Sequence, residues 1–593
     1  MNTTTMRVEA LRAWMKRNDL EAFVVPTADP HGSEYIPDYW KCREWLSGFT
    51  GSAGTAVVTL RGAALWTDSR YYLQAAQELE NSHFELMREG TEGVPQVGEW
   101  LCEQRVEVVG GNGALLSEDF AETLAEQGKK SFSFRFTDDP FCDIWNDRPA
   151  LPKGKIVPQS AIYTSRSAKE KLQLLGNALD KDEWLLLSDL SEIAWTLNLR
   201  GSDIAYNPVF LSYLLVSATN GRSVLFVDEE KLNSEAAHRL SAAGVAVRPY
   251  DGLAAVLMEL GNSHETICYE GTLTYSMKQL IAQASWSLRL IADGRTSLLK
   301  AVKDEGEQAG FRLAMERDGV ALIRFRRWLD EALLRGDDLT EQEIDRRLTA
   351  LRAEQAGFTS LSFATIAAAG EHGAIVHYEA EPTKSTPLPS NGFLLLDSGA
   401  QYDCGTTDIT RTIPLGWLTD EERRVYTLVL KAHIGLARLR FPEGTNGLQA
   451  DTAARAPLWH AGYDFGHGTG HGVGSHLCVH EGPHQIRKDK RACTMVALQP
   501  GMTITDEPGV YLEGRFGVRL ENVLMVRKDA DGFLSFEALT LCPFDTAPII
   551  QEMLTHEERA YLNAYHAEVR HRLLPLLSEE ADKQWLITAT QAI

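Results

Sequence analysis

The sequence predicts a mixed α/β (α+β) protein with two similar α/β domains followed by a larger domain of strands and helices. The chain has 593 residues, which is too long for one hydrophobic core. Short apolar runs alternate with amphipathic helical patterns in the first half, as in α/β domains. The second half contains two strand–turn–strand patterns that each carry a pair of carboxylates. These three observations lead to the predicted fold class.

The composition is that of a soluble globular protein, with 44% apolar and 24% charged residues. The formal net charge of −23 argues against nucleic-acid or anionic-membrane partners, which need a basic surface. The eight cysteines are scattered without a CxxC pair, so neither a disulfide framework nor a zinc knuckle is indicated. The first residues lack the apolar core of a signal peptide, and no apolar run approaches the ~20 residues of a membrane span. We therefore expect a cytoplasmic protein that binds neither nucleic acid nor membranes.

The first α/β domain is predicted over residues 1–152. An amphipathic helix within residues 6–25 precedes a short strand at 22–26, and two further strands are expected at 55–60 and 62–67. The apolar face of this helix is formed by Val8, Leu11, Trp14 and Met15.

A second, similar α/β domain is predicted over residues 153–297, after a proline-containing linker at 146–158. Residues 215–228 repeat the order of residues 54–68: strand, glycine turn, strand and acid. Duplication of one unit is the simplest interpretation of this repeat.

The third domain is predicted over residues 298–593. Its expected elements are a long helix from 297 to about 334, a helix at 340–355, mainly strands and turns at 359–543, and a helical tail at 552–577. A C-terminal extension is placed at about 549–593.

The first carboxylate pair is Asp397 and Asp408, in an apolar strand, a turn signal and a β-branched strand. If the two aspartates lie opposite each other, the hairpin closes at about Tyr402–Asp403, and both side chains point to one face about 5 Å apart. Because unpaired buried charge is costly, a cationic group is expected between them.

The second pair is Glu507 and Glu521, which lie symmetrically about the turn residue Gly514. That symmetry predicts a hairpin in which the two glutamates are directly opposed. Either pair alone is more often a solvated strand face, but two such hairpins in one chain indicate a site.

Residues 466–476 place histidines among alternating glycines, which allow the backbone to approach a bound group closely. Residues 480–484 match HExxH as a string, but Gly482-Pro483 would break the helix that this zinc motif needs. The phosphate-loop interpretation fails because GxxxxGK[ST] is missing. Four carboxylates and one histidine suit Mn²⁺, Co²⁺ or Zn²⁺, and bridging carboxylates suit two ions.

The sequence resembles the pita-bread metallopeptidases, and among them the long, three-domain cytosolic Xaa-Pro aminopeptidases. In the third domain, the matching motifs are Asp397-Ser-Gly, Thr407-Asp408-Ile-Thr-Arg411, His467-Gly-Thr-Gly-His471, Val479-His480-Glu-Gly-Pro483, Asp506-Glu507-Pro-Gly and Arg519-Leu-Glu521-Asn522. Near the N-terminus, they are Ser33-Glu-Tyr-Ile, Ser47-Gly-Phe-Thr-Gly-Ser-Ala-Gly and Trp66-Thr-Asp-Ser-Arg70-Tyr. The resemblance implies two creatinase-like domains followed by a pita-bread catalytic domain.

The resemblance also implies roles for individual residues. Asp397 would bind one metal ion, Asp408 and Glu521 would bridge two, and His471 and Glu507 would bind the other. The non-ligand active-site histidines would be His377 and His480, and His467 would bind substrate. Two further substrate-binding candidates come from position alone: Tyr511, which follows Glu507-Pro-Gly, as a wall of an apolar proline pocket, and Arg519, which would share the strand face of Glu521. Glu507 is the candidate proton relay. Two divalent ions, most often Mn²⁺ in this family, would activate a bridging hydroxide that attacks the bond before proline.

The implied activity is the release of an N-terminal residue from peptides with proline in second position, by a homodimer. A prolidase, which cleaves Xaa-Pro dipeptides, shares the five ligands and is the first alternative. A non-catalytic peptide-binding relative of the same fold is the second alternative. Such relatives usually lose ligands, whereas all five are kept here.

Overall fold

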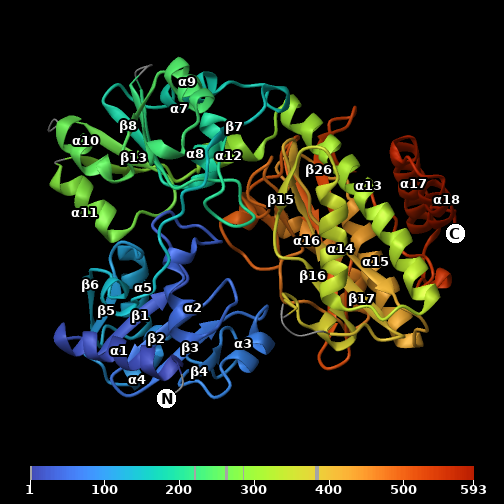
Figure 1. The fold of residues 1–593 in the computed structure, drawn as a ribbon, viewed down its shortest axis with the longest axis horizontal. Coiled ribbons are helices and arrows are strands. Elements are labelled where there is room, and N and C mark those ends of the chain that lie inside the picture. Colours follow the sequence, from blue (N-terminus) through green and yellow to red (C-terminus); the bar gives the residue numbers. More distant parts are fainter. Residues whose placement is uncertain (1–2, 219–221, 261–264, 285, 381–385) are drawn as a thin grey trace. The chain divides into compact units, whose positions relative to one another are not determined.

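A computed structural model of the protein describes residues 3–218, 222–260, 265–284, 286–380 and 386–593. The chain forms two compact units (Figure 1). Unit 1 contains Met1–Pro158, Ser167–Ala205 and Val209–Thr296, and unit 2 contains Gln159–Arg166, Tyr206–Pro208 and Ser297–Ile593. Both α/β sheets lie in unit 1. Within the described ranges, no helix is long and apolar enough to cross a membrane.

Unit 1 contains two six-stranded sheets with the same strand order and directions. The first has the order β4-β3-β2-β1-β5-β6 and the second β12-β11-β10-β8-β13-β14. The strands of the first sheet are β1 (Ala22–Pro26), β2 (Thr55–Thr59), β3 (Ala63–Thr67), β4 (Glu85–Arg88), β5 (Val108–Asn112) and β6 (Ser133–Thr137). Those of the second sheet are β8 (Glu183–Leu187), β10 (Tyr213–Ser217), β11 (Ser223–Phe226), β12 (Val245–Arg248), β13 (Thr266–Tyr269) and β14 (Ser287–Leu290). In each sheet a central strand (β1 or β8) pairs antiparallel with one neighbour and parallel with the other.

The predicted N-terminal elements are present. Helix α1 (Thr3–Arg17) buries the four apolar residues of the predicted face, and the strands at 22–26, 55–59 and 63–67 match the expected ones. The repeat at residues 215–228 covers parts of β10 and β11, which occupy the places of β2 and β3 in the common order. Residues 219–221 of its predicted turn lie outside the described residues.

The first helical segment of unit 2 differs from the single long helix that was predicted. It is divided into α12 (Arg295–Ala301) and α13 (Glu305–Arg335). The Asp304 side chain accepts a hydrogen bond from the Glu307 backbone, and the Glu307 side chain accepts one from the Asp304 backbone. This capping box starts a new helix, so the prediction of an unbroken helix was wrong. Helix α14 (Glu341–Ala353) lies where it was expected.

Two helices interrupt the region predicted to consist mainly of strands and turns. They are α15 (Asp420–Ala437) and α16 (Gly447–His460), which pack against each other. Each begins at a capping box, at Thr419 and at Asn446. Helix α17 (His556–Leu573) matches the predicted tail, whereas α18 (Glu580–Ala589) extends beyond it. Figure 1 shows α17 and α18 (red) beside α13, which both of them contact.

The first predicted hairpin forms with a register two residues away from the expected one. Strand β17 (Phe393–Ser398) pairs with β20 (Ile409–Pro414), so Asp397 lies opposite Thr410 rather than Asp408. Strands β18 (Ala400–Tyr402) and β19 (Gly405–Thr406) continue the pairing, with Tyr402 opposite Gly405. The turn is therefore Asp403–Cys404, one residue later than predicted. Because the register is shifted by two residues, the side chain of Asp408 still points to the same face of the sheet as that of Asp397.

The second hairpin has the predicted register. Strands β24 (Gly509–Leu512) and β25 (Phe516–Arg519) pair symmetrically about Gly514, which has a φ of +68°. The same register continues between β23 (Thr503–Asp506) and β26 (Asn522–Lys528), where Asp506 lies opposite Asn522. Strand β26 also pairs with β27 (Leu534–Ala538).

Candidate metal centre

The strand pairing of the second hairpin is interrupted at Glu507 and Glu521, which lie between the β24–β25 pair and the β23–β26 pair. At this break the Glu507 amide donates to Thr469 O (2.8 Å), and the Glu521 amide donates to Thr410 O (3.0 Å). Glu521 is thereby joined to the first hairpin, next to Asp408. The backbone thus brings the two predicted carboxylate pairs to one place.

A histidine from the glycine-rich segment completes this group. His471 lies in β21 (Gly470–Gly472), and its Nε2 atom is 3.6 Å from both Asp408 Oδ2 and Glu507 Oε1. Ligand atoms of Asp408, His471 and Glu521 lie within 4.8 Å of one another. A side chain at Gly470 would put its Cβ 1.9 Å from Thr505 O, so only glycine allows β21 to approach so closely.

The carboxylates of this group repel one another. Burial, followed by the charges of Asp397 and Glu507, raises the pKa of Asp408 well above its ordinary value. Burial and the charge of Asp408 raise the pKa of Glu521 in the same direction. Burial raises the pKa of Glu507 to about 7. Such a cluster needs bound protons or cations to be stable.

The donor set fits divalent metal ions. Asp397 Oδ1 is buried and has no hydrogen-bond partner among the described residues, so a lone pair is left for an ion. Oxygen-rich ligation with one imidazole is the environment that Mn²⁺, Co²⁺ or Zn²⁺ accepts, and acids this close favour more than one positive charge. Arg519 supplies one such charge from the protein, since its Nη2 donates to Asp397 Oδ2 at 2.6 Å. This is the kind of cationic partner that was predicted.

Arg519 begins a row of hydrogen bonds that ends at His467. Arg519 Nη1 donates to the Tyr511 hydroxyl (2.8 Å), which lies 2.7 Å from His467 Nε2. Burial, followed by the charge of Arg519, lowers the pKa of His467 to about 3, so the imidazole is neutral. Its Nδ1–H donates to Gly468 O (2.7 Å), which leaves Nε2 to accept from Tyr511. Three of the five predicted substrate-binding residues therefore form one oriented row beside Asp397.

The two remaining predicted histidines are His480 and His377. The His480 ring packs edge-on against His471, with centroids 4.4 Å apart. His377 is half-buried, and the carbonyl oxygen of the preceding Val376 accepts from Arg519 Nη2 at 3.5 Å. His480 thus lies against one of the predicted ligands, and the backbone next to His377 contacts Arg519.

The HExxH string is not a helix, as expected. Residues 481–486 form the strand β22 (Glu481–Ile486), and buried His484 lies with its Nε2 2.8 Å from Thr503 O. The Glu481 carboxylate is held by Lys300 (2.8 Å) and by Lys303. Sequence reasoning missed these two lysines because they lie about 180 positions before their partner.

Thr410 is a further residue that the sequence analysis missed. Its Oγ1 donates to Glu521 Oε2 at 2.7 Å and so orients one predicted bridging carboxylate. The sequence did contain a signal for Thr410, since this residue lies within the Thr407–Arg411 motif.

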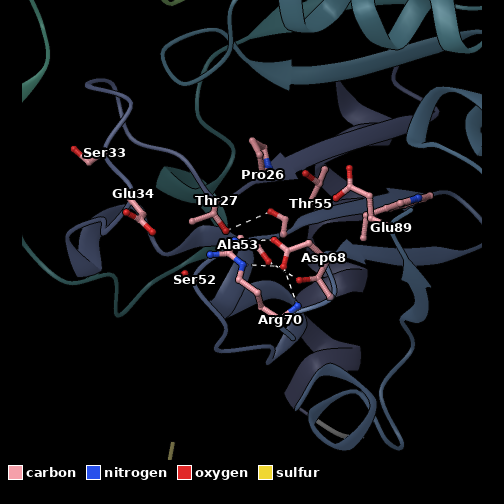
Figure 2. A pocket seen from close by; sticks show the side chains of 13 residues that line it. Pro26, Thr27, Ser33, Glu34, Ser52, Ala53, Thr55, Asp68, Arg70 and Glu89 are labelled. Carbon is pink, nitrogen blue, oxygen red and sulfur yellow. Dashed lines mark hydrogen bonds and ion pairs between the residues drawn. The ribbon is translucent and has the colours of Figure 1, made fainter. Parts of the chain in front are cut away.

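Unit 1 contains a separate cavity of about 310 Å³. It lies at the carboxyl ends of β1, β3 and β4 and is lined by hydroxyl groups, three acids and Arg70, which pairs with Asp68 at 2.7 Å (Figure 2). None of the predicted metal or substrate residues lines it.

Comparison with known proteins identifies both parts of the chain. The profile of metallopeptidase family M24 matches residues 309–528, and that of its C-terminal region matches 532–593. Two profiles of the creatinase/prolidase N-terminal domain match residues 7–138 and 147–307.

Relatives match over nearly the full length. A probable Xaa-Pro aminopeptidase P of Fusarium vanettenii is 41% identical, with 95% of each chain covered. Xaa-Pro aminopeptidase 1 of Dictyostelium discoideum is 38% identical, with 98% of this chain and 95% of the relative covered. The crystal structure of a Caenorhabditis elegans X-prolyl aminopeptidase, described as a cytosolic enzyme with a di-nuclear active site, superposes with a TM-score of 0.94 at 32% identity over 100% of both chains. The predicted fold class and family resemblance are confirmed: the chain belongs to the Xaa-Pro aminopeptidase P group of metallopeptidase family M24.

Proposed function

We propose that this protein is an aminopeptidase that releases the N-terminal residue from peptides with proline in second position. The observation that carries the proposal is the convergence of Asp408, His471, Glu507 and Glu521, with Asp397 beside them, in a chain related over its full length to Xaa-Pro aminopeptidases. A peptide-binding relative without catalysis would have no need to keep this costly cluster of buried acids.

The residues proposed to hold two divalent ions are Asp397, Asp408, His471, Glu507 and Glu521. Asp408 and Glu521 are the candidates for bridging, since the charge of Asp408 raises the pKa of Glu521 and the charges of Asp397 and Glu507 raise the pKa of both. The ions would polarise the scissile carbonyl and activate the attacking water. Mn²⁺ is the proposed metal, on the strength of the oxygen-rich ligand set.

Glu507 is the proposed proton carrier. Without metal its pKa is raised to about 7, mainly by burial, and Thr505 Oγ1 lies 3.4 Å from its Oε1. As a carboxylate beside the attacking water, Glu507 could accept a proton from that water and pass it to the leaving proline nitrogen. His480, against the ligand His471, and His377 are proposed to donate hydrogen bonds to the substrate carbonyl as it becomes charged.

Proline specificity is proposed to depend on the row from Arg519 to His467. Proline lacks an amide hydrogen and has a fixed ring, so its recognition needs shape and apolar surface rather than an acceptor. Tyr511 is half-buried, and its hydroxyl is fixed by Arg519 and His467, so its ring is the proposed apolar wall against the ring of proline.

Three further points are proposals. We propose a homodimer, as the family resemblance of the sequence implies, and a cytoplasmic location, because the C. elegans enzyme is described as cytosolic. We also propose domains at 1–152, 153–297 and 298–593, with the C-terminal extension from about 549. Near these boundaries the match to one family profile ends and the match to the next begins: between 138 and 147, between 307 and 309, and between 528 and 532.

The proposal is tested by hydrolysis of Arg-Pro-Pro and Gly-Pro with Mn²⁺ and again after EDTA. We expect metal-dependent release of arginine from the tripeptide and much slower cleavage of the dipeptide. Preference for Gly-Pro would show a prolidase instead. No cleavage of either peptide by folded, Mn²⁺-loaded protein would favour the peptide-binding alternative.

A further inference from the structure

A buried row of polar side chains lies directly behind the proposed metal ligands. We call it the His433 network, and it consists of Asp506, His433, Asn522, Arg411 and Tyr565. Their exposed fractions are between 0% and 6%. Asp506 directly precedes Glu507 and Asn522 directly follows Glu521, and the two are paired across β23 and β26. Because consecutive side chains of a strand point to opposite faces, this network lies on the face away from the ligands.

The hydrogen bonds at His433 fix one tautomer. Its Nδ1 atom is 3.1 Å from Asp506 Oδ2 and 3.1 Å from the Asp506 carbonyl oxygen. Its Nε2 atom is 3.4 Å from Asn522 Nδ2, a donor, so Nε2 accepts and Nδ1 carries the proton. The Asn522 amide is held in that orientation by Arg411, whose Nη2 donates to Asn522 Oδ1 at 2.8 Å. His433, on α15, therefore ties together the two residues that adjoin Glu507 and Glu521.

Arg411 joins the same row to the backbone of a ligand. Its Nη1 donates to the Glu521 carbonyl oxygen at 2.6 Å, and its Nη2 also donates to Cys542 O at 2.6 Å. The guanidinium lies over the Phe544 ring, 4.0 Å from its centroid. A planar group with this many acceptors has little freedom, so it fixes where the chain places Glu521.

The C-terminal extension closes the row through Tyr565 of α17. The Tyr565 hydroxyl accepts from Arg411 Nη2 at 3.1 Å and lies 2.9 Å from the carbonyl oxygens of Thr540 and Cys542. It also lies 3.4 Å from Asn522 Oδ1. Tyr565, more than 40 residues after Glu521 in the sequence, thus contacts the side chain that holds the Glu521 backbone.

We propose that Tyr565 and His433 are positioning residues, which set the spacing of Glu507 and Glu521. Through this spacing they set the affinity for the second metal ion, meaning the one that binds after the first site is filled. This inference rests on the proposed function, because it presumes that the two glutamates are ligands. It assigns a role to the C-terminal extension: α17 supports the metal centre from behind. Changes to groups that orient ligands typically weaken metal binding about 10- to 100-fold.

The test is Mn²⁺ binding to the full-length, EDTA-treated protein, measured by titration calorimetry and by the EPR signal of a coupled Mn²⁺ pair. Tyr565→Phe removes one hydroxyl and fills the same volume. The matched control is Tyr426→Phe, which removes a buried hydroxyl of α15 that donates to Asp545 O at 3.0 Å, outside the network. We expect about 10-fold or greater weakening of the second ion and loss of the coupled signal in Tyr565→Phe, and wild-type binding in Tyr426→Phe.

A purely structural role would lower the urea midpoint of both variants alike and leave Mn²⁺ binding unchanged in both, and this outcome would overturn the inference. His433→Gln changes the opposite end of the network and is expected to weaken binding of the second Mn²⁺ ion as Tyr565→Phe does. It provides the test if Tyr565→Phe does not fold. If wild-type protein itself fails to bind two ions, the proposed function fails. If the wild-type protein binds two ions and Tyr565→Phe and His433→Gln bind them equally tightly, only the present inference fails.

Discussion

Metal binding is expected to release at least about half a proton per protein at pH 7. Glu507, whose pKa is raised to about 7 mainly by burial, holds a proton about half of the time in the metal-free protein. Burial and neighbouring carboxylates raise the pKa values of Asp408 and Glu521 well above their ordinary range, which favours the protonated form of both carboxyls. Metal ligands must be deprotonated, so the protons that these groups hold leave when the ions enter.

The sign of the pH dependence follows from these protonated carboxyls. Protons compete with the ions, so Mn²⁺ binding tightens as the pH rises through about 7. Metal-free protein should behave in the opposite way. Its folded state binds more protons than the unfolded chain above the ordinary carboxyl pKa of about 4, so its stability falls as the pH rises from there through about 7.

Titration calorimetry at pH 7 in phosphate and in Tris measures the proton count, because the two buffers differ in ionisation enthalpy. The control is Asp545→Asn, which removes a partly buried acid that pairs with Arg326 outside the site and should leave the count unchanged. Release of clearly less than half a proton would show that the acids are already charged without metal, and the electrostatic reasoning would be refuted.

Three substitutions test other parts of the site. Glu507→Gln should lower kcat by about 10² to 10⁴ while the circular dichroism spectrum stays native; full activity with normal metal content would exclude the proton relay. Arg519→Met leaves buried Asp397 without its cation and should destabilise metal-free protein by about 3–5 kcal/mol in urea unfolding, with partial recovery in Mn²⁺. The same change at Arg326 should cost stability without any dependence on metal. Gly470→Ala would push its strand away from the neighbouring carbonyl and should weaken Mn²⁺ binding, which calorimetry would detect as a raised Kd.

The second hairpin was predictable because its sequence is symmetric about one turn residue. Gly514 adopts a left-handed φ, and the register it sets continues through both ladders to Asp506 and Asn522. The first hairpin lacked such a centre. Its Asp-Cys-Gly signal allows turns that differ by one residue, and the resulting shift by two positions became clear only from the pairing of Tyr402 with Gly405.

Other features depend on contacts between distant parts of the chain. Helices α15 and α16 were missed although Thr419 and Asn446 begin capping boxes, because the surrounding strand patterns were given more weight. The ion pair between Lys303 and Glu481 and the contact between Tyr565 and Arg411 join residues about 150 to 180 positions apart. No local pattern in one sequence indicates such partners.

Anomalous diffraction from crystals grown with Mn²⁺ would test the central claim most directly. We expect two anomalous peaks within the cluster, one beside Asp397 and one beside His471 and Glu507, with Asp408 and Glu521 contacting both. A single peak, or none at full Mn²⁺ concentration, would contradict the assignment of these five residues to a pair of ions.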